Sequence, residues 1–263
     1  MNENNQMRLR ILELAYKAGS NGAHLGGSLS LVEILQCLYN RNLNLNPDDS
    51  NRDRVILSKG HGALALYCIL EQKGLLSSVK VDSFEKNGSG IFAHAKRNLN
   101  NCIEFSGGSL SLGLSFAVGV ALACKSNHLT NHIYVIVGDG ECNEGLVWES
   151  VMSAAHYHLD NLTIIIDNNG LQSDGFTEAV MDSDKLDRKF EAFGCKAFNV
   201  DGHDMSSIEL ALDEICPQKP KVIIAHTVKG KGVSFLENQP SSHHVVLSAE
   251  QYEQAIKEVY DKV

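Results

Sequence analysis

The sequence predicts an α/β fold with a doubly wound, mostly parallel sheet flanked by helices. Two β-branched runs, HIYVIVGDG at 132–140 and LTIIIDNNG at 162–170, enclose a helical pattern over 144–158. That spacing is typical of a parallel strand–helix–strand unit. Because strands and helices go on alternating toward the C-terminus, we expect helices on both faces of one sheet.

The N-terminal region is expected to be helical. Apolar residues recur at helical spacing over 9–16, and the glycine-rich segment 21–30 then interrupts the pattern. A second helix follows, for which Ser30 is the expected N-cap and Glu33 completes a capping box.

The middle of the chain combines glycine-rich loops with buried elements. Residues 54–62 predict a short buried strand that ends in a glycine-rich loop, and 63–74 predict a helix. The stretch 106–124 carries no charge. Its first half is expected to be a loop, and Leu114–Cys124 a buried helix too short to cross a membrane.

The C-terminal part repeats the alternation. We expect a strand at 196–202, a helix at 206–215 that Asp204 caps, and a strand with its loop at 221–232. The tail from Ser248 predicts one amphipathic helix. With no linker or repeat in the sequence, a single domain over 1–263 is expected.

Composition excludes several classes of function. The 263 residues carry a formal charge of −9, which argues against binding to nucleic acid or to an anionic membrane surface. The seven cysteines form no CxxC pair, so neither a zinc site nor a disulfide framework is expected. No signal peptide is evident, and a reduced, cytoplasmic setting fits best.

Polar residues follow two of the expected strands at the point where each ends. Asp139 stands between Gly138 and Gly140, and Asn169 comes 30 positions later, after the second run. Ligands of open α/β sheets bind at the carboxyl ends of strands. The oxygen atoms of Asp139 and Asn169 are hard ligands of the kind that suits Mg²⁺. The two glycines allow a phosphate to approach the backbone, and the helix that starts near Glu144 directs its N–H groups toward that phosphate. The pattern therefore predicts a metal–diphosphate site.

The block from Gly138 to Gly170 resembles the thiamine diphosphate motif, which begins with GDG and ends with NN. Within that superfamily the chain resembles the N-terminal, diphosphate-binding half of a transketolase encoded as two chains. The resemblance covers nearly the whole sequence. Six blocks follow in the family's order: AHLGGSLS, ILSKGHG, GSLSLGLS, the GDG–NN block, VDGHD and AHTVKGKGVSF.

The resemblance implies roles for matching residues. Asp139, Asn169 and the carbonyl of Leu171 would hold Mg²⁺, or another divalent cation such as Ca²⁺ or Mn²⁺. The residues that would contact thiamine diphosphate are His61, Gly108, Ser109, Leu110, Gly138, Asp139, Gly140, Glu141, Asn169 and His226. Histidines matching those that bind the ketose and move its protons are His24, His94 and either His243 or His244. Glu144 and Glu149 match glutamates at a subunit interface.

Other charged residues in these blocks are expected to have structural roles. His203 should stabilise the turn before the helix at 206–215. Lys229 and Lys231 are expected to be solvated loop charges.

Ser111 and Leu112 depart from the family pattern, which usually has glycine followed by a polar residue. Because leucine cannot hydrogen-bond a sugar hydroxyl, we expect a substrate preference that differs from ordinary pentose phosphates. The substrate is then a sugar phosphate or a specialised donor or acceptor, for example a deoxy or otherwise modified ketose.

The resemblance also implies a missing half. The pyrimidine-binding domain, its activating glutamate and the substrate-phosphate arginines lie outside this half of the family. A partner, the C-terminal transketolase subunit, is therefore expected, in an α₂β₂ assembly. Alternatives are the α subunit of a 2-oxo acid dehydrogenase E1, a 1-deoxyxylulose-5-phosphate synthase-like carboligase, and a non-enzymatic regulatory paralogue that binds the cofactor.

Overall fold

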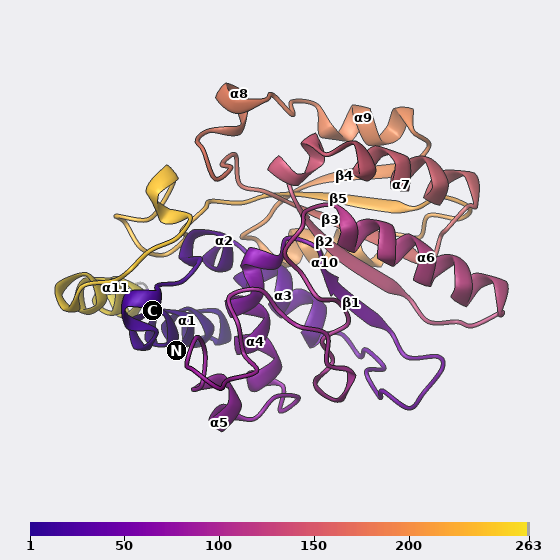
Figure 1. Cartoon of the computed structure of the whole chain (residues 1–263). Helices are drawn as coiled ribbons and strands as arrows, with labels where there is room; N and C mark the ends of the chain where they lie inside the picture. The colour runs from indigo at the N-terminus through magenta and orange to yellow at the C-terminus, as the bar shows by residue number, and fades with distance from the viewer. Residues whose placement is uncertain (262–263) are drawn as a thin grey trace.

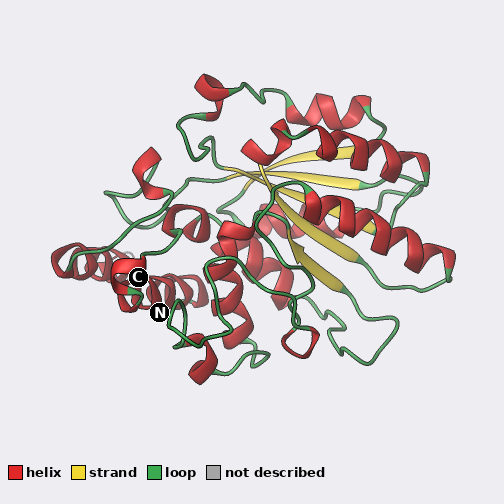
Figure 2. Cartoon of the chain, viewed as in Figure 1, coloured by secondary structure: helices red, strands yellow, loops and turns green. Residues whose placement is uncertain are grey.

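Five parallel strands in the order β1-β2-β3-β5-β4 form the centre of the protein, which confirms the predicted fold class (Figures 1 and 2). The structure, a computed structural model, describes residues 1–261. The strands are β1 Arg54–Leu57, β2 Ile133–Gly138, β3 Leu162–Asn168, β4 Lys196–Asp201 and β5 Lys221–His226. Their register aligns the carboxyl ends, with Gly138 opposite Asp167 and Asn168 opposite His226. Loops that leave these ends therefore meet at one edge of the sheet.

Helices cover both faces of this sheet. They are α1 Glu3–Lys17, α2 Leu25–Leu29, α3 Val32–Asn40, α4 Ala63–Gln72, α5 Ser78–Val81, α6 Leu112–Ser126, α7 Gly145–His156, α8 Thr177–Val180, α9 Leu186–Ala192, α10 Met205–Asp213 and α11 Ala249–Asp261. In Figure 1, α6, α7 and α9 lie on one side of the strands, while α1, α3 and α4 lie on the other.

The strand residues divide into two cores by their period of two. In β2, Val135 and Val137 join the core that contains α6 and α7 residues, whereas Tyr134 and Ile136 join the core built with α1, α3 and α4. Because both faces of β2, β3 and β5 are buried, these strands are nearly continuous apolar runs, whereas the edge strand β4 is largely exposed.

Several local expectations can be compared with the structure. Asp204 caps α10, accepting a hydrogen bond from the Ser206 amide at 3.1 Å. Ser30 does not cap α3, so that prediction is wrong. It has helical backbone angles, and its hydroxyl donates to Asp167 Oδ2 at 2.7 Å, because the tight turn before α3 directs it toward β3.

Two further findings concern membrane-spanning helices and the cysteines. No helix among residues 1–261 is long and apolar enough to span a membrane. All seven cysteines are free thiols, and six of them are buried.

Candidate functional site

A cavity of about 310 Å³ lies at the carboxyl edge of the sheet. Lys59 and His61 reach it from the loop after β1, the 138–141 segment from the end of β2, and the 169–174 turn from the end of β3. Lys229 enters from the loop after β5. The parallel register thus gathers four loops that are far apart in sequence.

Most of the residues singled out from the sequence line this cavity. These are His24, His61, His94, Gly108, Leu110, Gly138, Asp139, Gly140, Glu141, Asn169, Leu171 and His243. The fold therefore brings the expected metal, diphosphate and substrate residues into one place, which their separation in sequence could not establish.

Asp139 and Asn169 are held firmly against the turn that follows β3. Asp139 is 2% exposed, and its Oδ2 accepts hydrogen bonds from the Gly170 amide at 3.0 Å and from Thr177 Oγ1 at 2.9 Å. Burial raises the pKa of Asp139, against the lowering effect of the Thr177 bond. Asn169 accepts from the Leu171 amide at 3.1 Å. These bonds set the turn before any ligand arrives.

The donor chemistry fits a Mg²⁺–diphosphate group. The Asp139 carboxylate, the Asn169 amide oxygen and the Leu171 carbonyl are hard oxygen ligands of the kind Mg²⁺ takes. Among residues 1–261 no three His, Cys, Asp or Glu side chains could hold a metal by themselves. A metal here would therefore need further oxygen ligands besides these three, from water or from a bound ligand. A Cβ added to Gly108, whose φ is +143°, would meet no atom within 4 Å, which leaves open space beside this loop.

Two buried lysines supply positive charge that the sequence analysis missed. Lys59 is 0% exposed; it is ion-paired with Asp167 and donates to the Gly27 carbonyl at 3.1 Å. Lys229 is 1% exposed, so the expectation that it is a solvated loop charge is wrong. Burial, followed by the charge of Lys59, lowers the pKa of Lys229 to about 8. The one sequence signal that could have indicated the burial of Lys229 was its position directly after an expected strand and beside glycines.

Lys229 connects the 169–174 turn to a histidine. Its Nζ donates to the carbonyls of Leu171 at 3.3 Å and Gln172 at 3.1 Å, and lies 3.3 Å from His243 Nδ1. One ammonium group thus holds two carbonyls of the turn and faces the imidazole cluster.

Five histidines form that cluster. The ring of His24 lies 5.2 Å from those of His94 and His243, 4.9 Å from His244 and 6.1 Å from His61. His244 is exposed at the edge and does not line the cavity.

The environment of three of these histidines keeps them neutral. Burial and neighbouring cations or imidazoles lower the pKa of His24 to about 3 and that of His243 to about 4, and that of His61 falls well below its usual value. As neutral rings they offer one hydrogen-bond donor and one acceptor each.

Glu141 reaches the cavity, but its carboxylate is engaged by the protein. It accepts from Ser58 Oγ at 2.5 Å, the Ser111 amide at 2.6 Å and the Gly138 amide at 3.0 Å. It thereby joins the loops after β1 and β2 to the start of α6. Ser111 adopts a left-handed conformation with φ of +71°, held by this bond.

Other singled-out residues lie outside the cavity. His226 is exposed, bonds to Asn199 Oδ1 at 2.9 Å, and belongs to a neighbouring depression of about 740 Å³ that shares Asp139 and Asn169. Ser109 is exposed and does not line the cavity. Leu112 does not line it either, and is 46% exposed on α6.

Comparisons with known proteins give a consistent result. The sequence profile of the family described as "Transketolase, thiamine diphosphate binding domain" matches residues 2–261. The chain is 42% identical over 245 residues to one of the subunits of the apulose-4-phosphate transketolase of Actinobacillus succinogenes, covering 92% of this chain and 89% of that protein. It is 38% identical over 260 residues to the 6-deoxy-6-sulfo-D-fructose transketolase subunit SqwG of a Clostridium species, covering 97% and 94%.

The fold agrees with this relationship. The crystal structure of transketolase from Campylobacter jejuni superposes with a TM-score of 0.86 at 29% identity, covering 99% of this chain and 43% of that one. The match to the N-terminal half of a transketolase, expected from the sequence, is thereby confirmed.

Proposed function

Because this chain belongs to the family of transketolase thiamine diphosphate-binding domains, we propose that it is the diphosphate-binding subunit of a two-chain transketolase. The enzyme transfers a two-carbon ketol unit from a ketose donor to an aldose acceptor. The observation that carries this proposal is the single cavity in which Asp139 and Asn169 meet the histidine cluster. It combines a metal–diphosphate site with groups suited to sugar hydroxyls.

The metal and diphosphate would be held at the carboxyl edge of the sheet. Asp139, Asn169 and the Leu171 carbonyl would bind Mg²⁺, or Ca²⁺ or Mn²⁺ in its place. The ammonium group of Lys229 would balance phosphate charge in a part of the cavity that excludes water, whereas the charge of Lys59 is already paired with Asp167. When bound, thiamine diphosphate supplies the nucleophilic carbon and the electron sink that ketol transfer needs.

The chain's own histidines would orient the sugar and relay its protons. His24 Nδ1 is buried and has no hydrogen-bond partner in the described part of the chain. A sugar hydroxyl would relieve this unsatisfied nitrogen. Neutral His24 can donate to one hydroxyl and accept from another. In neutral His243, Nδ1 faces the Lys229 ammonium as an acceptor, so its Nε2–H is left to donate to a hydroxyl.

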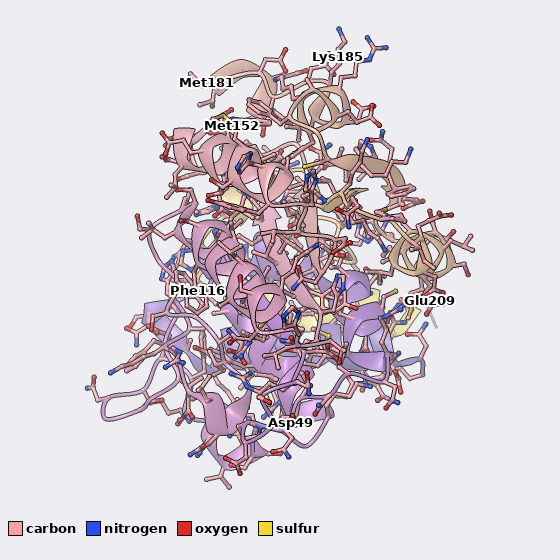
Figure 3. All side chains as sticks on the ribbon, turned by 90° about the vertical axis from the view of Figure 1, so that its right-hand side faces the viewer. Asp49, Phe116, Met152, Met181, Lys185 and Glu209 are labelled. Atoms are coloured by element: carbon pink, nitrogen blue, oxygen red, sulfur yellow. The ribbon has the colours of Figure 1, made fainter. Side chains whose placement is uncertain are left out.

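An apolar face beside the cavity supports a protein partner. Leu112 is 46% exposed, Met152 on α7 53% and Met181 after α8 60%. Figure 3 shows Phe116, Met152 and Met181 along one side of the molecule. Glu144 and Glu149 are exposed at the start of α7 and along it.

Leu110 lines the cavity, and the exposed Leu112 follows two residues later at the start of α6, so this end of the face lies near the cavity. A protein docked here would cover both. We expect the pyrimidine-binding, C-terminal transketolase subunit in this place, in an α₂β₂ complex. Leu112 would then contact the partner, rather than sort substrates directly as its sequence position led us to expect.

The donor we propose is a modified ketose with an anionic end. The relatives at 38–42% identity are named for apulose 4-phosphate and for 6-deoxy-6-sulfofructose, whereas the human transketolase is 32% identical. A phosphate or a sulfonate carried on an unusual sugar is the feature that these two names share.

The test is a transfer assay on the purified chain with its partner chain. Donors are apulose 4-phosphate, 6-deoxy-6-sulfofructose, xylulose 5-phosphate and pyruvate, each with and without thiamine diphosphate and Mg²⁺. Activity that needs both chains and both cofactors is expected. Turnover by this chain alone would contradict the need for a partner. Turnover of pyruvate instead would indicate 2-oxo acid chemistry, and cofactor binding by the complex without any turnover would indicate a regulatory paralogue.

A further inference from the structure

His203 connects two loops that are distant in sequence. Its Nε2 accepts a hydrogen bond from the Val228 amide at 2.8 Å, and its Nδ1 lies 2.9 Å from Glu33 Oε2. Because Nε2 is an acceptor, the ring proton resides on Nδ1 and is donated to the carboxylate. His203 therefore does more than stabilise its own turn, the role expected from the sequence. It attaches the loop after β5 to α3.

Arg8 holds the other end of the same loop. Its Nη2 lies 2.7 and 2.9 Å from the two oxygens of Glu33, and its Nε donates to the Lys231 carbonyl at 3.2 Å. Arg8 is 5% and Glu33 4% exposed. The carboxylate of Glu33 is thus the common partner of two side chains, one at each end of the segment 228–231.

Two glycines allow this loop to lie close to Arg8 and to Gly26. A Cβ on Gly232, whose φ is +102°, would lie 2.9 Å from Arg8 Cδ. The Gly230 amide donates to the Gly26 carbonyl at 3.0 Å. Lys229 lies between the two held ends, and its side chain passes into the cavity to the Leu171 and Gln172 carbonyls.

We propose that Glu33, His203 and Arg8 form a buried clamp that positions Lys229 for the diphosphate of the cofactor. The clamp touches neither substrate nor cofactor and acts through Lys229. Outer contacts of this kind usually contribute about 10–100-fold to metal affinity or activity. The inference rests on the proposed function, because it assigns Lys229 to the diphosphate expected there.

A double-mutant cycle tests the clamp. Isothermal titration calorimetry would measure thiamine diphosphate binding, in excess Mg²⁺, to the complete chain with its partner. His203→Ala should weaken binding by about 10-fold or more. His203→Gln should largely restore it, because its amide oxygen can accept from Val228 and its NH₂ can donate to Glu33. In a Lys229→Met background, His203→Ala should change affinity by less than about 2-fold, because non-additivity marks residues that act as one unit.

Several outcomes would overturn the inference. Wild-type affinity for thiamine diphosphate in His203→Ala would exclude the proposed clamp. If His203→Ala lost as much affinity in the Lys229→Met background as in the wild type, His203 would not act through Lys229. His128→Ala, at an exposed loop histidine, is the control. If His203→Ala loses its helical circular dichroism, His203→Asn replaces it in the cycle, because its shorter amide cannot reach both partners. Failure of the wild-type complex to bind thiamine diphosphate would overturn the proposed function and the clamp together, whereas normal wild-type binding with an unaffected variant overturns the clamp alone.

Discussion

Replacing Lys59 with methionine isolates the most deeply buried charge of the site. Lys59 and Asp167 are both 0% exposed and ion-paired. Three other side chains donate to Asp167: Ser30, Thr227 and Asn169. Removing one partner of a buried pair typically costs about 3–5 kcal/mol, because the other charge is left uncompensated. Since Asp167 keeps three of its four donors, we expect the free energy of unfolding to fall by about 3 kcal/mol, the lower end of this range.

Urea and thermal unfolding, followed by Trp148 fluorescence and circular dichroism, measure this loss. The expected fall in thermal midpoint is roughly 6–12 °C for a chain of this size. Lys125→Met is the matched control, because Lys125 and Asp160 form an ion pair with side chains 34% and 33% exposed. Exposed pairs typically contribute about 0–1 kcal/mol.

The pH dependence makes this test sharper. Burial alone would raise the pKa of Asp167, but the charge of Lys59 and the hydrogen bonds outweigh it and lower the pKa. A carboxyl with a lowered folded pKa stabilises the fold above its unfolded pKa of about 3.9, and that stability is lost as the pH falls through the folded value. Without Lys59 the folded pKa rises, so the difference between variant and wild type should be largest near neutral pH and shrink in acid. A loss below about 1 kcal/mol at neutral pH, or a loss that does not depend on pH, would refute the reasoning.

Three further predictions address the metal, the partner and the histidines. Asp139→Ala should weaken Mn²⁺ binding in the presence of thiamine diphosphate by more than about 100-fold, since it removes a ligand rather than an outer contact; unchanged paramagnetic resonance titrations would contradict this. Leu112→Glu should abolish co-elution with the partner chain and leave the thermal midpoint unchanged, whereas Leu210→Glu on the exposed face of α10 should leave both unchanged; co-elution of the first variant would exclude the proposed docking face. Burial lowers the pKa values of His24 and His243 to about 3 and about 4, so both rings should stay neutral by NMR down to about pH 5. Because the unfolded imidazoles gain protons near pH 6.5, the fold should lose stability as the pH falls below that value. Protonation of either ring near pH 6.5 would show the assignment to be wrong.

The fold class and the central strand–helix–strand unit could be predicted because their signals are local, whereas the short helices α5, α8 and α9 were not predicted. The β-branched runs became β2 and β3 with the expected helix between them, and the aspartate and asparagine at their ends lie at one edge of the sheet. A continuous run of β-branched residues is typical of a parallel strand that is buried on both faces, so these two runs had few other structural interpretations. Asp204 was identified as a cap for the same reason, since a cap acts within one turn of its own residue.

Errors arose where a side chain acts at long range. Ser30 has the spacing of a cap but bonds to Asp167, 137 positions away. Lys229 has the composition of an exposed loop but is buried beneath the cavity.

By itself, the sequence determined the α/β class and the family, and it predicted that Asp139 and Asn169 lie together at the carboxyl edge of the sheet, because these depend on hydrophobic period and on motifs of a few residues. Only the tertiary structure decided which charges are buried, which histidines are neutral, and that Arg8, Glu33 and His203 hold the Lys229 loop. Burial and pairing depend on groups brought together from distant segments, and a pKa reflects all charges and dipoles around a group rather than its neighbours along the chain.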